Sequence, residues 1–217
     1  IVLFGPWDMG LITDSPSVRR KFLDSVLVQV DREYRRALLS YEKGLRARNK
    51  LLERIRDEGA ARGQLLFWDR LLIKNGDYLS SKREEFLEFV NNTPALDSEI
   101  FHLEYDKSAI SEARLAQYAD EEVAAAATLV GPHRDDIIFQ ITNHKSQITK
   151  NLAVYGSRGE QRMCILWLKL AELSFIETHS ASSGQTGDRP VLLLDDIFSE
   201  LDHRHREIVM GVIGKQQ

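Results

Sequence analysis

Two adjacent carboxylates, Asp195 and Asp196, directly follow a short apolar run at residues 191–194. A run of this kind is typical of a strand that is buried on both faces of a parallel sheet. The carboxyl edge of such a sheet is where α/β proteins bind their ligands. At that edge Asp195 can hold Mg²⁺, which prefers oxygen ligands, and Asp196 can orient or deprotonate an attacking water. The alternative interpretation is a buried strand followed by an exposed acidic turn that performs no chemistry.

A second pattern lies just before a predicted helix, where residues 156–162 have the sequence Gly-Ser-Arg-Gly-Glu-Gln-Arg. Glycine and serine at a helix start offer backbone N–H groups and a hydroxyl where the helix dipole is positive, and this arrangement favours an anion. The sequence therefore indicates an anion site at this helix start. An ordinary helix capped by Ser157 also explains the same residues.

These two patterns, about 35 residues apart, together resemble the head of an ABC-type ATPase. Residues 156–162 resemble its signature motif, Asp195 and Asp196 its Walker B pair, and residues 199–202 (Ser-Glu-Leu-Asp) its D-loop. The second Walker B residue is usually Glu in such ATPases. Asp196 instead matches the RecF family, a group of bacterial recombination proteins related to the SMC proteins. Further resemblance to this family covers nearly the whole chain and is clearest at residues 15–24, 41–49 and 130–136.

The resemblance implies ATP and Mg²⁺ as cofactors. Asp195 would hold Mg²⁺ and Asp196 would position the water, while Ser199 and Asp202 would couple two sites. The signature loop would contact the γ-phosphate of a nucleotide held by a second subunit, chiefly through Ser157 and Gly159. The residues of this loop that we expect at the nucleotide are Ser157, Arg158, Gly159 and Glu160.

The resemblance also implies partners. They are DNA with single-strand/double-strand junctions, a second copy of the chain in an ATP-dependent homodimer, and recombination-mediator proteins. The implied process is recombinase loading at single-strand gaps, and the implied location is the cytoplasm. One alternative is an SMC-like structural or scaffold protein with little or no ATP turnover, although such a protein would lose the carboxylate that Asp196 retains. Another is an unrelated Mg²⁺ hydrolase, which needs more converging carboxylates, for example from Asp135 and Asp136.

The loop that cradles phosphates in ATPases, Gly-x₄-Gly-Lys-[Ser/Thr], is not found in this sequence. At the Gly214-Lys215 pair, Val209 stands where the first Gly should be, and Gln216 follows. We expect the loop to lie upstream of Ile1 and the chain to be truncated at both ends. By itself this chain is predicted not to hydrolyse ATP, whereas the complete protein is predicted to be a weak DNA-dependent ATPase.

Charge is unevenly distributed along the chain. The whole sequence has 29 Lys+Arg and 33 Asp+Glu, a net charge of −4, yet residues 17–70 hold 14 basic and 8 acidic residues. Such a basic segment suggests contact with an anion. The resemblance implies a helical arm that contacts DNA phosphates, which needs no base-reading residues. A solvated helix of mixed charge is the alternative. The arginines that we predict to contact DNA are Arg19, Arg20, Arg46 and Arg48.

The predicted fold class is α/β, an ABC-type ATPase lobe with an inserted, mainly helical arm. Apolar periodicity predicts the elements. The helices are expected over 16–57, 64–91, 108–127 and 158–178 and from 202, and the strands over 1–4, 97–106, 137–141 and 191–194. We predict the end of a first lobe at 1–14, the arm at 15–128 and a second lobe at 129–217.

Other residues give weaker signals. Apolar residues make up 43% of the chain, and no apolar run is long enough for a membrane span. The single cysteine, Cys164, can form no internal disulfide, which fits a protein of the reducing cytosol. Cys164 and Trp167 are predicted to pack in the core. His133 and its neighbours are either a functional cluster or a turn held by local salt bridges. His203 and His205 lie on different helix faces and are not expected to bind a metal.

Overall fold

The computed structural model describes residues 1–96, 99–143, 147–182, 190–196, 198 and 203–215. The chain forms two compact units. The first unit consists of Ile1–Phe22, Phe86–Tyr105 and Ile137–Gln217. The second unit consists of Leu23–Glu85 and Asp106–Asp136. These limits differ from the predicted domains because residues 15–22 and 86–105 pack with the first unit and residues 129–136 with the second.

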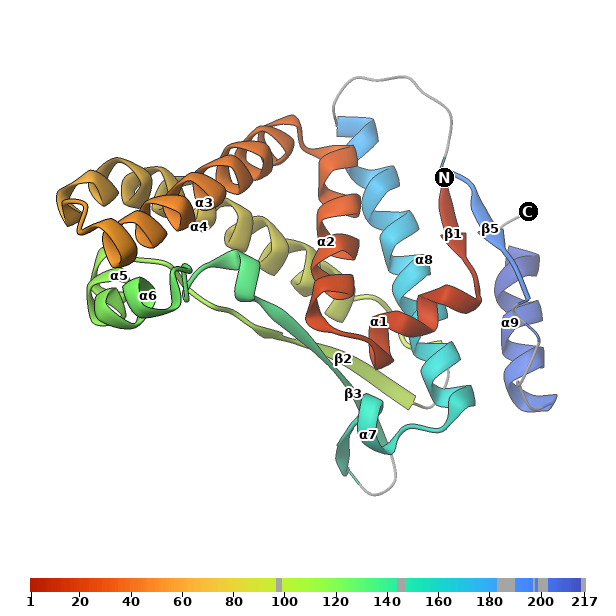
Figure 1. Cartoon of the computed structure of the whole chain (residues 1–217). Helices are drawn as coiled ribbons and strands as arrows, with labels where there is room; N and C mark the ends of the chain where they lie inside the picture. Colours follow the sequence, from red (N-terminus) through yellow and green to blue (C-terminus); the bar gives the residue numbers. More distant parts are fainter. Residues whose placement is uncertain (97–98, 144–146, 183–189, 197, 199–202, 216–217) are drawn as a thin grey trace. The chain divides into compact units, whose positions relative to one another are not determined.

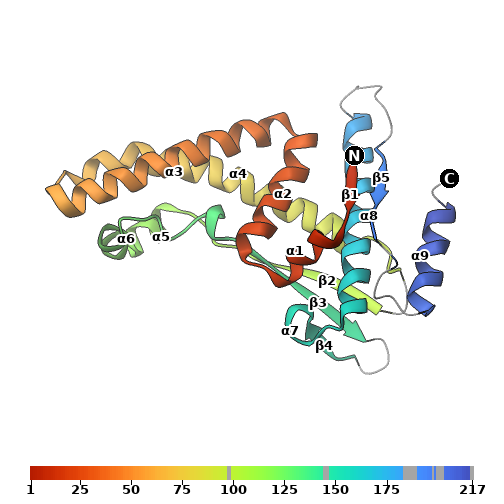
Figure 2. The ribbon, with the colours of Figure 1, turned by 45° about the vertical axis from the view of Figure 1, so that its right-hand side comes forward.

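A parallel pair of strands, β1 (Val2–Phe4) and β5 (Leu192–Leu194), lies in the first unit. Val2 pairs with Leu192 and Phe4 with Leu194, and helix α8 (Arg158–Ser182) packs against β1 (Figures 1 and 2). Val2 and Phe4 are buried, whereas the side chains that point the other way are exposed, at 40% for Leu3 and 49% for Leu193. In the part of the chain that the structure describes, only one face of this pair is covered, so the expected burial of residues 191–194 on both faces is not found there.

The first unit also contains a three-stranded sheet in the order β2-β3-β4. The strands are β2 (Glu99–Asp106), β3 (Asp136–Asn143) and β4 (Thr149–Asn151). Phe101 and Leu103 of β2 are buried, as the alternating pattern predicts. Strands β3 and β4 are antiparallel, with Gln140 opposite Asn151.

Helix α8 supplies much of the first unit's core. Trp167 and Cys164 are buried, as predicted, and the Trp167 ring lies near Phe101 of β2. Burial raises the pKa of the Cys164 thiol. The smaller helices of this unit are η1 (Pro6–Met9), α1 (Gly10–Thr13), α7 (Leu152–Tyr155) and α9 (His203–Lys215).

Two helices, α2 (Pro16–Val30) and α3 (Arg32–Glu58), occupy the stretch for which the sequence predicts one helix. Asp31 separates them: its backbone is extended, and its carboxylate accepts hydrogen bonds from the N–H groups of Glu33 and Tyr34. Aspartate is favoured at such an N-cap position. The prediction of a single helix is therefore wrong at Asp31. The predicted end of the second helix is confirmed, since Gly59 adopts the left-handed conformation (φ 69°) that ends α3.

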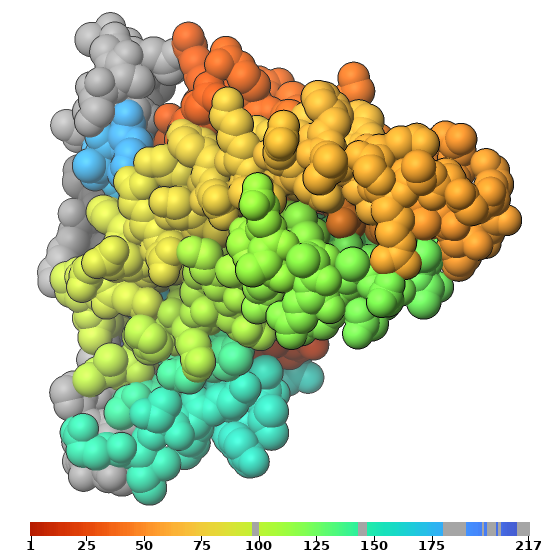
Figure 3. Space-filling view, turned by 90° about the vertical axis from the view of Figure 1, so that its left-hand side faces the viewer, coloured from red at the N-terminus to blue at the C-terminus, as the bar shows by residue number. Residues whose placement is uncertain are grey.

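Helices α3 and α4 (Leu65–Asn91) lie side by side in the second unit. Their approach is close at Gly44, where a Cβ atom would lie 2.5 Å from Leu71 Cδ2. The shorter helices α5 (Glu112–Gln117) and α6 (Ala119–Ala125) lie against this pair, as the green surface in Figure 3 shows. The 3₁₀ turns η2 (Arg62–Gln64) and η3 (Pro132–Arg134) complete the unit. None of the described helices is long and apolar enough to cross a membrane.

Candidate functional site

The two predicted site carboxylates lie where β5 ends. The N–H group of Asp195 donates to the carbonyl of Phe4 at 2.9 Å, so the parallel pairing continues up to this residue. Asp196 follows with a left-handed backbone (φ 51°), which is uncommon for residues other than glycine. Both aspartates are exposed, and the Asp196 side chain is 54% exposed. The strand thus ends in two accessible carboxylates, as predicted.

Arg162 connects this turn to α8. Its guanidinium Nη1 donates to the carbonyl oxygen of Asp196 at 2.8 Å, and its Nη2 lies 4.0 Å from Asp196 Oδ2. The Arg162 side chain is buried, and it lies one helical turn beyond Gly159. The structure therefore brings the segment predicted as a signature motif and the predicted Walker B turn together in the first unit.

The start of α8 is closed by reciprocal hydrogen bonds. The Ser157 hydroxyl accepts from the Glu160 N–H at 3.2 Å, and a Glu160 carboxylate oxygen accepts from the Ser157 N–H at 2.6 Å. This is a capping box. The interpretation of Ser157 as a helix cap is therefore correct, but it does not exclude an anion, because the first amides of a helix have no partner within the helix. Ser157 and Arg158 are exposed, and Gly159 is half-buried beside the His205 ring of α9.

These residues suit a nucleotide with its metal. Magnesium is usually held by one or two carboxylates together with water and phosphate oxygens, and Asp195 and Asp196 offer two exposed carboxylates at one strand end. The start of α8 offers amides and the Ser157 hydroxyl to a phosphate. Glu160 adds a negative charge beside that start. Ser199 and Asp202 lie outside the described residues.

Comparison with known proteins identifies the family. No family model matches the chain. The DNA replication and repair protein RecF of Herpetosiphon aurantiacus is 36% identical over 242 residues, which cover 100% of this chain and 57% of that protein. RecF of Thermomicrobium roseum is 35% identical over 247 residues, which cover 99% of this chain and 59% of that protein. The chain belongs to the RecF family. It spans somewhat more than half the length of these curated relatives.

Solved RecF structures have the same fold. The structure of the recombination mediator protein RecF-ATP in the RecFOR pathway matches with a TM-score of 0.82 at 31% identity, over 97% of this chain and 58% of that one. The corresponding RecF-ATPrS structure matches with a TM-score of 0.79 at 32% identity, over 95% and 59% of the two chains. The fold class predicted from the sequence, an α/β ATPase lobe of the ABC type with a mainly helical arm, is confirmed.

Two of the four arginines predicted to contact DNA are buried. Arg19 donates from Nη1 to the carbonyl oxygens of Leu11 and Asp14, at 3.2 and 2.7 Å. Arg48 is 2% exposed, and its guanidinium contacts Asp69 at 2.7 Å, Glu122 at 2.7 Å and Thr128 at 2.9 Å. A phosphate could reach neither guanidinium without unfolding its surroundings. The prediction of direct DNA contact is therefore corrected for Arg19 and Arg48, which hold the fold.

The other two arginines are accessible. Arg20 is half-buried, and Arg46 is 71% exposed beside Glu42 at 3.9 Å. Arg46 belongs to a row of exposed side chains spaced by three or four residues, which places them on one face of α3. We call the basic members of this row the α3 basic stripe: Arg32, Arg36, Lys43, Arg46 and Lys50. Sequence reasoning missed this stripe, although the spacing of these five residues could have shown it.

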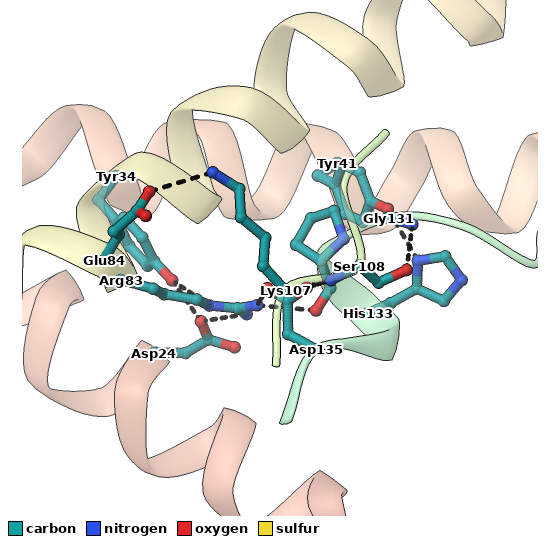
Figure 4. A network of polar contacts seen from close by, with 11 residues as sticks. Asp24, Tyr34, Tyr41, Arg83, Glu84, Lys107, Ser108, Gly131, His133 and Asp135 are labelled. Carbon is teal, nitrogen blue, oxygen red and sulfur yellow. Dashed lines mark hydrogen bonds and ion pairs between the residues drawn. The ribbon is translucent and has the colours of Figure 1, made fainter. Parts of the chain in front are cut away.

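The stretch at 130–136 that resembles the RecF family is part of a buried polar network in the second unit (Figure 4). Arg83 is its centre: Nη1 donates to Asp135 Oδ2 at 2.9 Å and Nη2 to Asp24 Oδ1 at 2.8 Å, and Nε donates to the Tyr34 hydroxyl at 3.1 Å. Burial raises the pKa of Tyr34. His133 Nδ1 is bonded to the Tyr41 hydroxyl at 2.8 Å. Of the two interpretations of this cluster, the structural one fits better, but long-range buried contacts such as Arg83–Asp135 hold the turn, not the predicted local salt bridges.

The hypothesis of an unrelated Mg²⁺ hydrolase finds no support in the fold. Asp135 is 0% exposed and its carboxylate is paired with Arg83, so a metal ion or a substrate cannot reach it. Among the described residues, no group of three His, Cys, Asp or Glu side chains is placed to hold a metal.

Proposed function

We propose that this chain is the part of a RecF-type protein that carries the signature loop, the Walker B carboxylates and the DNA-contacting arm. That protein would bind ATP with Mg²⁺, dimerise on DNA, and assist recombinase loading at single-strand gaps in recombinational repair and replication-fork maintenance. The observation that supports this best is the Arg162 contact, which places the start of α8 and the carboxylate turn in one assembly. The RecF structure solved with ATP supports the choice of nucleotide.

The proposed chemistry is divided between two sets of residues. When bound, Mg²⁺ would neutralise charge on the phosphate oxygens, and Asp195 is the carboxylate that would hold it. Asp196 would orient the attacking water and accept its proton. Ser157 would donate its hydroxyl, and Gly159 its amide, to the terminal phosphate of a nucleotide bound by a second copy of the chain.

The proposed DNA contact is the α3 basic stripe. It extends from Arg32 to Lys50, about 27 Å along a helix that rises about 1.5 Å per residue. Lys43 and Lys50 form no ion pair within the described part of the chain, so their charges are available to phosphates. Contacts of this kind give affinity without base specificity. A protein that acts at gaps of any sequence needs this type of contact.

The first test measures the solution mass of the full-length protein that carries these residues, as an Asp196→Asn variant, with and without MgATP. If Asp196 serves hydrolysis, the variant retains its nucleotide, and the mass doubles only when MgATP is present. A monomer under both conditions would contradict the shared site. The control is Gly159→Glu in the same background. A Cβ atom at this position meets only the His205 ring, at 3.7 Å, so a side chain can start there without a clash, and the charge of the glutamate opposes a phosphate and should abolish the doubling.

One observation favours a second candidate, an SMC-like scaffold that turns over little ATP. The Glu160 carboxylate is held at the start of α8 by the Ser157 N–H. A negative charge beside an anion site weakens phosphate binding. Under this candidate, dimers of the wild-type protein form only at high MgATP concentration, and steady-state phosphate release is absent with and without DNA.

A further inference from the structure

Arg162 has two properties that its place in a signature motif does not explain. Its guanidinium is buried although the carboxylate that it approaches, Asp196, is mostly exposed. In addition, its shortest contact with Asp196 is to the backbone carbonyl at 2.8 Å, whereas the carboxylate oxygen is 4.0 Å away. An arginine selected only to neutralise Asp196 would contact the carboxylate first.

The backbone of Asp196 explains this geometry. Its φ of 51° is in the left-handed region, which residues other than glycine adopt uncommonly, although aspartate does so more often than most. The hydrogen bond from Arg162 is made to the carbonyl of this same residue. A charge-assisted bond at that position stabilises the left-handed turn and thereby fixes the direction in which the Asp196 side chain leaves the backbone.

We propose that Arg162 is a positioning residue for Asp196, and that it connects this carboxylate mechanically to the start of α8. The proposal rests on the proposed function, because that function gives Asp196 the role of orienting the attacking water. Arg162 is five residues from Ser157, about 7.5 Å along a rigid helix. A phosphate that binds at the start of α8 and shifts the helix therefore moves the group that holds Asp196. One helix thus binds one nucleotide and directs the carboxylate that acts on the other.

The test compares Arg162→Met with Lys169→Met in the full-length protein. Lys169 is the control, since it is also a buried cation of α8, and its ion pairs are with Asp8 and Glu172 rather than with Asp195 or Asp196. Both variants should lower the Tm. Only Arg162→Met should lower kcat, by about tenfold or more, while the ATP concentration for half-maximal dimerisation stays unchanged. Arg162→Lys, which can still donate to the carbonyl, should recover part of kcat. Equal kcat values for Arg162→Met and Lys169→Met would overturn the proposal.

A double-mutant cycle with Asp196→Asn tests whether Arg162 acts through Asp196. Adding Arg162→Met to Asp196→Asn should not further lower the residual single-turnover rate of ATP hydrolysis, whereas independent roles would lower it again by the factor seen in the wild-type background. Hydrogen exchange supplies a readout that needs no turnover. In Arg162→Met the amides of Asp195 and Asp196 should exchange faster, and in Lys169→Met they should not. Unchanged exchange in Arg162→Met refutes the positioning role even if the protein hydrolyses no ATP. Failure of the positioning role can therefore be distinguished from failure of the proposed ATPase function.

Discussion

Buried and exposed arginines have different roles in this chain, although they can be close neighbours in the sequence. Arg46 and Arg48 are two residues apart on α3. Arg46 is 71% exposed, and Arg48 is enclosed by Asp69, Glu122 and Thr128. Helical periodicity could have separated them, because Arg48 follows the spacing of the buried Tyr41, Gly44 and Leu51. Charge alone does not distinguish the two arginines, so a prediction made from charge places Arg48 at the DNA together with Arg46.

The difference gives a stability prediction. Arg48→Met leaves the buried carboxylate of Glu122 and its neighbour Asp69 without their shared cation, and removing one partner of a buried pair typically costs about 3–5 kcal/mol. Arg46→Met should change the free energy of unfolding by no more than about 0.5 kcal/mol. Urea unfolding of both variants measures this difference. Similar midpoints for the two variants would show that Arg48 is not buried as described.

A pH prediction follows from Glu172. Burial raises the pKa of this carboxyl, with Lys169 opposing the shift. A raised pKa in the fold means that the stabilising contribution is present below the unfolded value of 4.5 and is lost as the pH rises through the folded pKa. Glu172→Gln imitates the protonated form and leaves Lys169 paired with Asp8. At pH 7 the variant should therefore be at least as stable as the wild type.

The measurement for Glu172 is thermal unfolding between pH 4 and pH 8. The advantage of Glu172→Gln over the wild type should shrink as the pH falls towards 4.5. An advantage that grows in acid would contradict the assigned cause. Lys169→Gln is the complementary variant. It leaves the carboxylates of Asp8 and Glu172 without their common cation and should be destabilised most at neutral pH.

At the scale of elements, the sequence predicted most helices and strands, because long periodic patterns determine which faces are buried. The alternation in β2 and the glycine at the end of α3 are examples. The break at Asp31 was missed because the apolar period continues across it, and only the side-chain hydrogen bonds of Asp31 show it. The expected burial of β5 on both faces is not found for a different reason. An apolar strand sequence does not reveal how many neighbours the strand has.

The α3 basic stripe carries the prediction at this scale. Replacing Lys43, Arg46 and Lys50 by Gln should weaken DNA binding in the full-length protein. The slope of log affinity against log salt should fall by up to about 0.9 for each lost duplex phosphate contact. Arg56→Gln is the matched control, since Arg56 is an exposed arginine of α3 that lies outside the stripe and pairs with Asp57. Fluorescence titrations at several salt concentrations measure the slopes. An unchanged slope in the triple variant would remove the stripe from the DNA interface.

For the whole molecule, the candidate site was partly predictable. Asp195, Asp196 and Ser157 lie on the elements that the sequence assigned to them, because strand ends and helix starts are local features. Arg162 was named only as part of a motif. Its contact with Asp196 depends on how α8 packs beside the strand pair, and no local pattern contains that information. The two units are also built from segments that alternate along the chain, so a division into consecutive ranges could not describe them.

The burial of Cys164 has a practical consequence. It is the single thiol of this chain, it is fully buried, and burial raises its pKa, so the reactive thiolate is scarce and inaccessible. Maleimide dyes and spin labels will therefore not react with Cys164 in the folded protein. A cysteine introduced at the exposed Lys50 or Arg158 would be modified selectively without first removing Cys164. The arm or the signature loop can thus be labelled for single-molecule fluorescence with no other change to the chain.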